Sequence, residues 1–194
     1  MKKFLLVFMF AATAGAVNAQ VQFGAKAGAN FATLTGDDVE DAKTKVGLNL
    51  GLFARLPLTE SIKLQPELVY SMQGAKDDTE GDASLNFNYI NVPVMFQYHT
   101  TSGFFVETGP QVGFLTSAKF KFEDEDVDIK DEFKGVDFSW GFGLGYQLPA
   151  GFGVNARYNL GLSNIAEDFE GETPNIKNSV IQVGVFYTFG SGGN

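Results

Sequence analysis

Strict alternation of large apolar and small residues is the feature of this sequence that most restricts its fold. Every second position from 138 to 148 holds a large apolar side chain: Phe138, Trp140, Phe142, Leu144, Tyr146 and Leu148. The positions between them hold serine, glycine or glutamine. Because the side chains of a β-strand point alternately to its two faces, this segment is predicted to be a strand with one bulky face and one nearly bare face.

The same period of two residues recurs along the chain and predicts eight strands. They lie at residues 22–31, 46–56, 62–73, 85–99, 104–114, 138–148, 152–162 and 181–189. In the fourth of these segments the apolar residues change parity near Tyr89, and a β-bulge there is predicted to restore a common face. The connections after the second, fourth and sixth strands are tight, whereas the other connections are long and polar.

The bare faces indicate what surrounds these strands. They consist mostly of glycine, asparagine, glutamine and isolated charges, which is too small and too sparsely charged a set for the water-facing side of a soluble sheet. In a narrow membrane barrel the bulky residues face lipid and the small or polar residues fill the interior. We therefore predict an all-β fold: a closed antiparallel eight-stranded transmembrane β-barrel with up-and-down topology, short periplasmic turns and long extracellular loops. A soluble ligand-binding barrel is the alternative.

The N-terminus has the layout of a secretory signal peptide, with Lys2 and Lys3, an apolar run over residues 4–17 and a small residue at Ala19. Cleavage is expected before Gln20, and an uncleaved anchor is the alternative. The expected domains are a signal peptide (1–19), an outer-membrane β-barrel (20–189) and a short C-terminal tail (190–194).

Composition excludes several classes of protein and partner. The chain has no cysteine, so it forms no disulfide and carries no lipid on an N-terminal cysteine. Removal of the two N-terminal lysines leaves 12 Lys+Arg against 23 Asp+Glu, which changes the formal net charge from −9 to −11. Nucleic acid is not expected as a partner, because binding it requires a basic surface.

Several segments resemble a known family of barrels. They are VQFGAKAGANFATLTG, NYINVPVMFQYH, GFGLGYQL, GFGVNARYNLGLSNI and the final VGVFYTF. Together they resemble the small outer-membrane β-barrels common in Bacteroidota, often described as PorT-like or porin-like, over nearly all of the mature chain. The resemblance implies a location in the outer membrane of a Gram-negative cell and insertion by the barrel-assembly machinery. It implies no catalytic residues, because the family shares none. One departure is the tail after Phe189, since barrel-assembly signals commonly end on a terminal aromatic residue.

Four charged residues fall on the predicted interior faces at similar depth: Lys26, Glu67, Glu107 and Arg157. Unpaired charges in a narrow lumen cost considerable free energy, so two cations and two carboxylates at one level are predicted to form a buried network. Such a network would plug the lumen. A proton or ion path through the same residues, and the absence of direct contact between them, are the alternatives.

The single histidine, His99, falls in a predicted tight turn at the periplasmic rim. A membrane-embedded hydrolase or acyltransferase usually needs a histidine near the outer rim beside a nucleophile or a carboxylate. We therefore expect His99 to be a solvated turn residue, and likewise Arg55 and Lys63 near the periplasmic mouth. No catalytic residue and no cofactor is predicted.

Nineteen of the 23 acidic residues lie in the four long loops. Such loops would repel anionic lipopolysaccharide unless divalent cations bridged the two, so weak Ca²⁺ or Mg²⁺ binding is one interpretation. Its candidate ligands are Asp124, Asp126 and Asp128. Their spacing is not that of an EF-hand, because Ile129 stands where glycine is required. A solvated acidic surface is the alternative.

These patterns favour a structural or adhesive protein whose acidic loops meet an extracellular protein or glycan ligand and whose lumen is plugged by side chains. Outer-membrane lipid and lipopolysaccharide are its expected surroundings, and it is expected to be monomeric or weakly associated. A small pore or a component of a secretion apparatus, as the family label suggests, is the alternative. An enzyme ranks below both.

Overall fold

The computed structural model describes most of the chain beyond the predicted signal peptide. The described residues are 21–37, 39, 42–77, 83–122, 125–168 and 174–189. The predicted signal peptide (1–19) and C-terminal tail (190–194) lie outside them. Among the described residues there is no helix with the length and hydropathy of a membrane span.

The described residues form nine β-strands and one turn of 3-10 helix. In chain order these are β1 (Gln22–Thr35), β2 (Lys43–Pro57), β3 (Ile62–Asp77), β4 (Ala83–His99), β5 (Phe104–Phe122), β6 (Glu125–Asp128), η1 (Lys130–Glu132), β7 (Val136–Gln147), β8 (Phe152–Gly161) and β9 (Lys177–Thr188). Eight strands are long, and β6 is a short extension.

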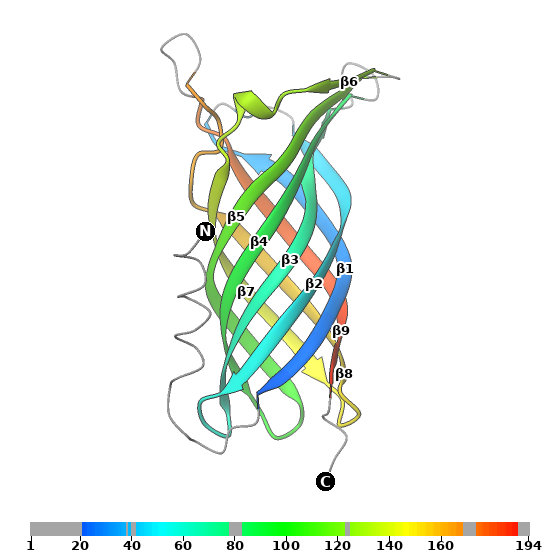
Figure 1. Cartoon of the computed structure of the whole chain (residues 1–194), viewed down its shortest axis with the longest axis vertical. Coiled ribbons are helices and arrows are strands. Elements are labelled where there is room, and N and C mark those ends of the chain that lie inside the picture. Colours follow the sequence, from blue (N-terminus) through cyan, green and yellow to red (C-terminus); the bar gives the residue numbers. More distant parts are fainter. Residues whose placement is uncertain are drawn as a thin grey trace, which may run out of the picture.

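The eight long strands close into a barrel. They pair in the order β4-β3-β2-β1-β9-β8-β7-β5, and β4 also pairs with β5, so no long strand is left with an open edge (Figure 1). β6 pairs with the end of β5 and forms with it a short hairpin beyond the barrel. Closure is what a hydrocarbon environment requires, because an unpaired backbone amide there costs several kcal/mol. The predicted closed antiparallel eight-stranded barrel is confirmed.

The two faces of each strand are divided as the alternation predicts. On β2, Leu48, Leu50 and Leu52 are 61–65 % exposed, whereas the intervening Asn49 and Gly51 are buried. The same division holds on the other long strands, where large apolar side chains cover the outside. The bulky face therefore points away from the lumen, as a lipid-facing surface must.

Glycines on the inner face make room for aromatic rings. Three inward phenylalanines each lie opposite a glycine on the next strand, in the pairs Phe53–Gly24, Phe105–Gly145 and Phe186–Gly153. A Cβ on any of these glycines would lie within 2.4 Å of a ring atom. The ring of Phe186 packs against those of Phe53 and Phe105, with centroids 6.1 and 5.9 Å apart. This aromatic cluster fills the periplasmic end of the lumen, and it explains part of the bare pattern seen in the sequence.

A register shift lies near Tyr89, as the sequence predicted, but it does not change the face to which the residues of β4 point. Alternate residues of β4 stay buried along its whole length, including Phe87, Tyr89 and Asn91. The shift in register does occur opposite Tyr89, but the extra residue is Thr116 on β5. Phe87 and Tyr89 point inward because the upper end of the barrel encloses an apolar core rather than a polar lumen.

That apolar core closes the extracellular mouth. Its buried members are Leu34, Ala75, Phe87, Tyr89, Leu115, Ala118 and Ile165, and Val39, Ala42, Leu85, Ile129, Phe133 and Ile176 pack against them. Several of these residues come from the connections, which the sequence indicated only as long and polar. The backbone N–H of Ile165 donates to the carbonyl of Ile176 (2.8 Å). This hydrogen bond joins the two described ends of the last long loop at the mouth of the barrel.

Candidate functional site

The four predicted interior charges meet in the lower half of the lumen. Nζ of Lys26 lies 3.1 Å from a carboxylate oxygen of Glu67. The guanidinium of Arg157 donates to both oxygens of Glu67 (2.7 and 2.9 Å) and to Glu107 (2.7 Å). All four side chains are at most 6 % exposed. Each carboxylate therefore faces a cation at hydrogen-bonding distance within a region closed to solvent.

The strand pairing explains how Arg157 on β8 reaches Glu107 on β5. Gly143 of β7 lies between them and pairs with both. A Cβ on Gly143 would lie 2.8 Å from Oε1 of Glu107. The missing side chain thus leaves the space in which the guanidinium and the carboxylate meet.

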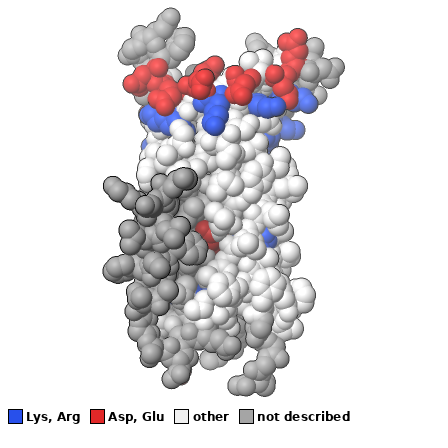
Figure 2. Space-filling view, viewed as in Figure 1, with Lys and Arg blue, Asp and Glu red and all other residues white. Residues whose placement is uncertain are grey.

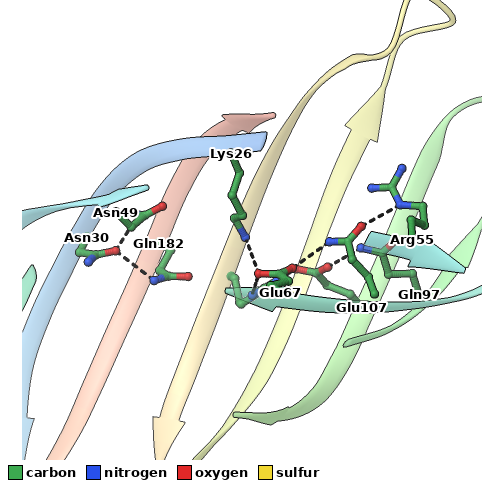
Figure 3. Close-up of polar contacts among 10 residues, drawn as sticks. Lys26, Asn30, Asn49, Arg55, Glu67, Gln97, Glu107 and Gln182 are labelled. Atoms are coloured by element: carbon green, nitrogen blue, oxygen red, sulfur yellow. Dashed lines mark hydrogen bonds and ion pairs between the residues drawn. The ribbon is translucent and has the colours of Figure 1, made fainter. Parts of the chain in front are cut away.

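Further polar side chains extend the charged network to every strand of the barrel, and Figure 3 draws part of it. Gln65 donates to Glu67 and accepts a hydrogen bond from Arg55, whereas Gln97 donates to Glu107. Arg55 also donates to Gln147, which in turn donates to Thr188. The members of this network, from β1 to β9 in chain order, are Lys26, Arg55, Gln65, Glu67, Gln97, His99, Glu107, Gln147, Arg157 and Thr188. We call this set the lumen network.

Two residues expected to be solvated are buried members of the lumen network. Arg55 is 1 % exposed, and its guanidinium lies 5.1 Å from the ring centre of Phe53 and 5.5 Å from that of Phe186. His99 is 7 % exposed, stacks on Phe105 with ring centres 4.8 Å apart and lies 2.9 Å from the side-chain oxygen of Gln97. The expectation failed because the aromatic cluster shields the periplasmic end from water. Lys63 is half-buried.

Little free volume remains beside the lumen network. A cavity of about 10 Å³ is lined by Arg55, Gln97, Asn155 and Arg157 among others, which is room for about one water molecule. Oδ1 of Asn155 has no hydrogen-bond partner among the described residues. The lower lumen is thus largely filled by side chains in the part of the chain that the structure describes.

A second, uncharged polar cluster lies above the lumen network. Asn30 accepts hydrogen bonds from Asn49 (2.7 Å) and Gln182 (3.1 Å) and donates to Ser71 (2.9 Å), and Figure 3 shows its separation from the charges. Higher still, Asp137 accepts hydrogen bonds from Asn178 and Ser163. The alternation placed Asn30, Asn49, Ser71 and Gln182 inside the barrel, but it gave no signal for their partners. Asp137, Ser163 and Asn178 lie just outside the strands that the sequence predicted.

Two of the three candidate metal ligands lie among the described residues, and both contact lysine residues. Asp124 lies outside the described residues. Asp126 and Asp128 are exposed on β6; the first lies 3.6 Å from Nζ of Lys119, and the second accepts a hydrogen bond from the backbone of Lys130. In the part of the chain that the structure describes, no three acidic, histidine or cysteine side chains are close enough to hold a metal ion.

Comparison with known sequences agrees with this architecture. Residues 13–167 match the profile of the family described as the outer membrane protein beta-barrel domain. The chain belongs to this family. The protein is thus an outer-membrane β-barrel, and its exposed apolar belt is the surface that faces lipid. No curated protein matches its sequence.

Solved structures of bacterial surface barrels share the fold. Neisserial surface protein A is 14 % identical, with a TM-score of 0.58, over 86 % of this chain and 97 % of that one. Ail, the attachment invasion locus protein of Yersinia pestis, is 16 % identical, with a TM-score of 0.51, over 87 % of this chain and 99 % of that one, in a complex with the heparin analogue sucrose octasulfate. At these identities the likeness concerns the fold alone.

Proposed function

We propose that this protein is a non-conducting surface barrel that presents an acidic extracellular face to a binding partner and catalyses no reaction. The observation that carries the proposal is the lumen network, in which charged and polar side chains from all eight barrel strands occupy the cross-section. Buried charges paired in this way exclude water and mobile ions. The aromatic cluster below and the apolar core above add two further barriers.

The finer assignments rest on sequence motifs and belong to the same proposal. We assign the chain to the PorT-like barrels of Bacteroidota, with cleavage of residues 1–19, a barrel domain from residue 20 to 189 and insertion by the barrel-assembly machinery. Within this reading Lys26, Glu67, Glu107 and Arg157 act as a structural plug.

Conductance in planar lipid bilayers tests the closed lumen. The folded wild-type barrel is expected to give no stable current step. The variant Glu67→Ala, Glu107→Ala, Arg157→Ala removes three of the four central charges and is expected to raise the frequency of openings, because three large side chains leave the cross-section. A steady current through the wild-type barrel that the triple variant alters would instead support the transport alternative.

The charge of the extracellular end indicates the kind of partner. Carboxylates gather at this end of the molecule (Figure 2). Those among the described residues are Asp37, Glu125, Asp126, Asp128, Asp131, Glu132, Glu167 and Asp168. Such a surface favours a cationic protein segment or a ligand bridged by divalent cations, since like charges repel. Ail was crystallised with a polyanion, and we propose that the partner of this chain has the opposite charge.

Binding to model polymers tests the sign of the partner. The barrel in detergent is expected to bind immobilised polylysine in a salt-dependent manner and not to bind heparin in the presence of EDTA. Replacing Asp131 and Glu132 of η1 with Asn and Gln is expected to weaken polylysine binding several-fold, whereas Glu60→Gln in a periplasmic turn serves as the control and has no effect. Heparin binding of equal strength would contradict the proposal.

A further inference from the structure

A row of lysines crosses the outer face of the barrel above the apolar belt. Lys43 of β2 pairs with Lys76 of β3, Lys76 pairs with Ser84 of β4, and Ser84 pairs with Lys121 of β5. Side chains directly opposite one another in a sheet share a face. That face is the outer one, because Ala75 and Ala83, the neighbours of Lys76 and Ser84, are buried inside. We call Lys43, Lys76 and Lys121 the lysine row.

The lysine row lies at the level of lipid headgroups. The last large apolar side chains facing out on β3, β4 and β5 are Met72, Ile90 and Phe114. Lys76 follows Met72 by four residues, which on a tilted strand is roughly 10 Å above the hydrocarbon. The headgroup layer is about 5–8 Å thick on each side of a bilayer, and a lysine chain can bend back toward it. Figure 2 shows lysines between the uncharged belt and the carboxylates on the face drawn.

The residues between the belt and the lysine row are polar and suit a headgroup. Asn86, Asn88 and Thr116 are the outward side chains on β4 and β5 at this height. Asn86 and Ser84 lie in hydrogen-bonding contact, with Asn86 donating. Toward the extracellular end, the outer surface of the barrel thus changes from apolar side chains to amides and hydroxyls and then to lysines. A phosphorylated glycolipid presents its acyl chains, sugar and phosphates in the same order.

Loop carboxylates lie beside part of the lysine row, since Asp126 of β6 pairs directly with Lys121 of β5. Lys119 lies on β5 two residues below Lys121. Its Nζ is 3.6 Å from a carboxylate oxygen of Asp126, and both side chains are half-exposed. Lys76 and Lys121 form no ion pair with any residue that the structure describes.

We propose that the lysine row binds the phosphate groups of an outer-leaflet glycolipid. The glycolipid then binds the side of the barrel formed by β2 to β5 in preference to the other side. Strands lie about 4.8 Å apart, so the row from Lys43 to Lys121 spans three strand spacings, roughly 15 Å. A single headgroup carrying two phosphates, or two neighbouring headgroups, fits this span. The inference requires only the outer-membrane location and is independent of which partner meets the loops.

Lipid retention by the folded barrel tests this proposal. The full mature chain, folded in detergent with EDTA, is titrated with diphosphorylated lipid A, and bound lipid is counted by native mass spectrometry. The double variant Lys76→Gln, Lys121→Gln is expected to bind roughly 25-fold more weakly, since each lysine near an anionic lipid surface contributes a factor of about five. Lipid A stripped of its phosphates is expected to bind wild type and variant alike.

A matched control removes the same charge from the same end of the barrel. Lys130 on η1 and Lys177 on β9 lie outside the lysine row, and the variant Lys130→Gln, Lys177→Gln is expected to bind within twofold of wild type. Equal weakening in both double variants would overturn the proposal, because net charge would then be the cause. The proposal would also be overturned if the wild-type barrel bound phosphate-free lipid A as tightly as diphosphorylated lipid A. Binding that disappears in EDTA would overturn it as well, and it would assign the lipid to loop carboxylates bridged by divalent cations. None of these results bears on the closed lumen or on the charge of the loop partner, which bilayer conductance and polylysine binding test separately.

Discussion

Replacing Arg157 with methionine is expected to lower the free energy of unfolding of the barrel by about 3–5 kcal/mol, the usual cost of breaking a buried ion pair on one side. Arg157 is the only cation that contacts Glu107, and it shares Glu67 with Lys26, among the residues that the structure describes. Without it, Glu107 keeps a single hydrogen bond from Gln97. Urea unfolding in phospholipid vesicles, followed by Trp140 fluorescence and by gel mobility without boiling, measures the change.

Two further variants separate the lost ion pair from general damage. Lys130→Met removes an exposed cation and is expected to leave the free energy of unfolding within about 0.5 kcal/mol of wild type, as for most surface substitutions. Adding Glu107→Gln to Arg157→Met is expected to recover about half of the loss, since no uncompensated carboxylate then remains beside Gln97. If the Arg157→Met barrel unfolds at the same urea concentration as the wild-type barrel, the lumen network does not stabilise the fold.

Replacing Gly28 with valine is expected to prevent closure of the barrel. Gly28 of β1 pairs with Gly184 of β9, where the first and last strands meet. A Cβ on Gly28 would lie 2.4 Å from the carbonyl oxygen of Val183 and 2.8 Å from Cα of Gly184. These are backbone atoms that cannot move without breaking the pairing. We expect a cost at or above about 3 kcal/mol, the upper end for overpacked sites.

The adjacent residue provides the control for this substitution. Ala27→Val adds the same side chain to the outer face of the same strand, where Ala27 is exposed. It is expected to keep the faster mobility of a closed barrel on unboiled gels, whereas Gly28→Val loses it. A Gly28→Val barrel that folds with wild-type mobility and stability would show that the two strands do not approach as closely as the structure places them.

The alternation of side chains was enough to predict the barrel, but only part of what fills its lumen. Because the period of a strand is two residues, the pattern assigned Lys26, Glu67, Glu107 and Arg157 to one face. The size of the residues on the other face then identified that face as the lipid-facing one. No knowledge of strand register was needed for either step, since both depend on local geometry and on the surrounding medium.

Contacts between strands could be found only in the tertiary structure. The burial of His99 and Arg55 depends on three phenylalanines from β2, β5 and β9. The inward position of Tyr89 depends on loop residues such as Ile165 that cover the mouth. The lysine row depends on the register of four strands. A one-residue shift in register would exchange every pair, and register is set by closure of the whole barrel, so the sequence of a single strand does not contain it.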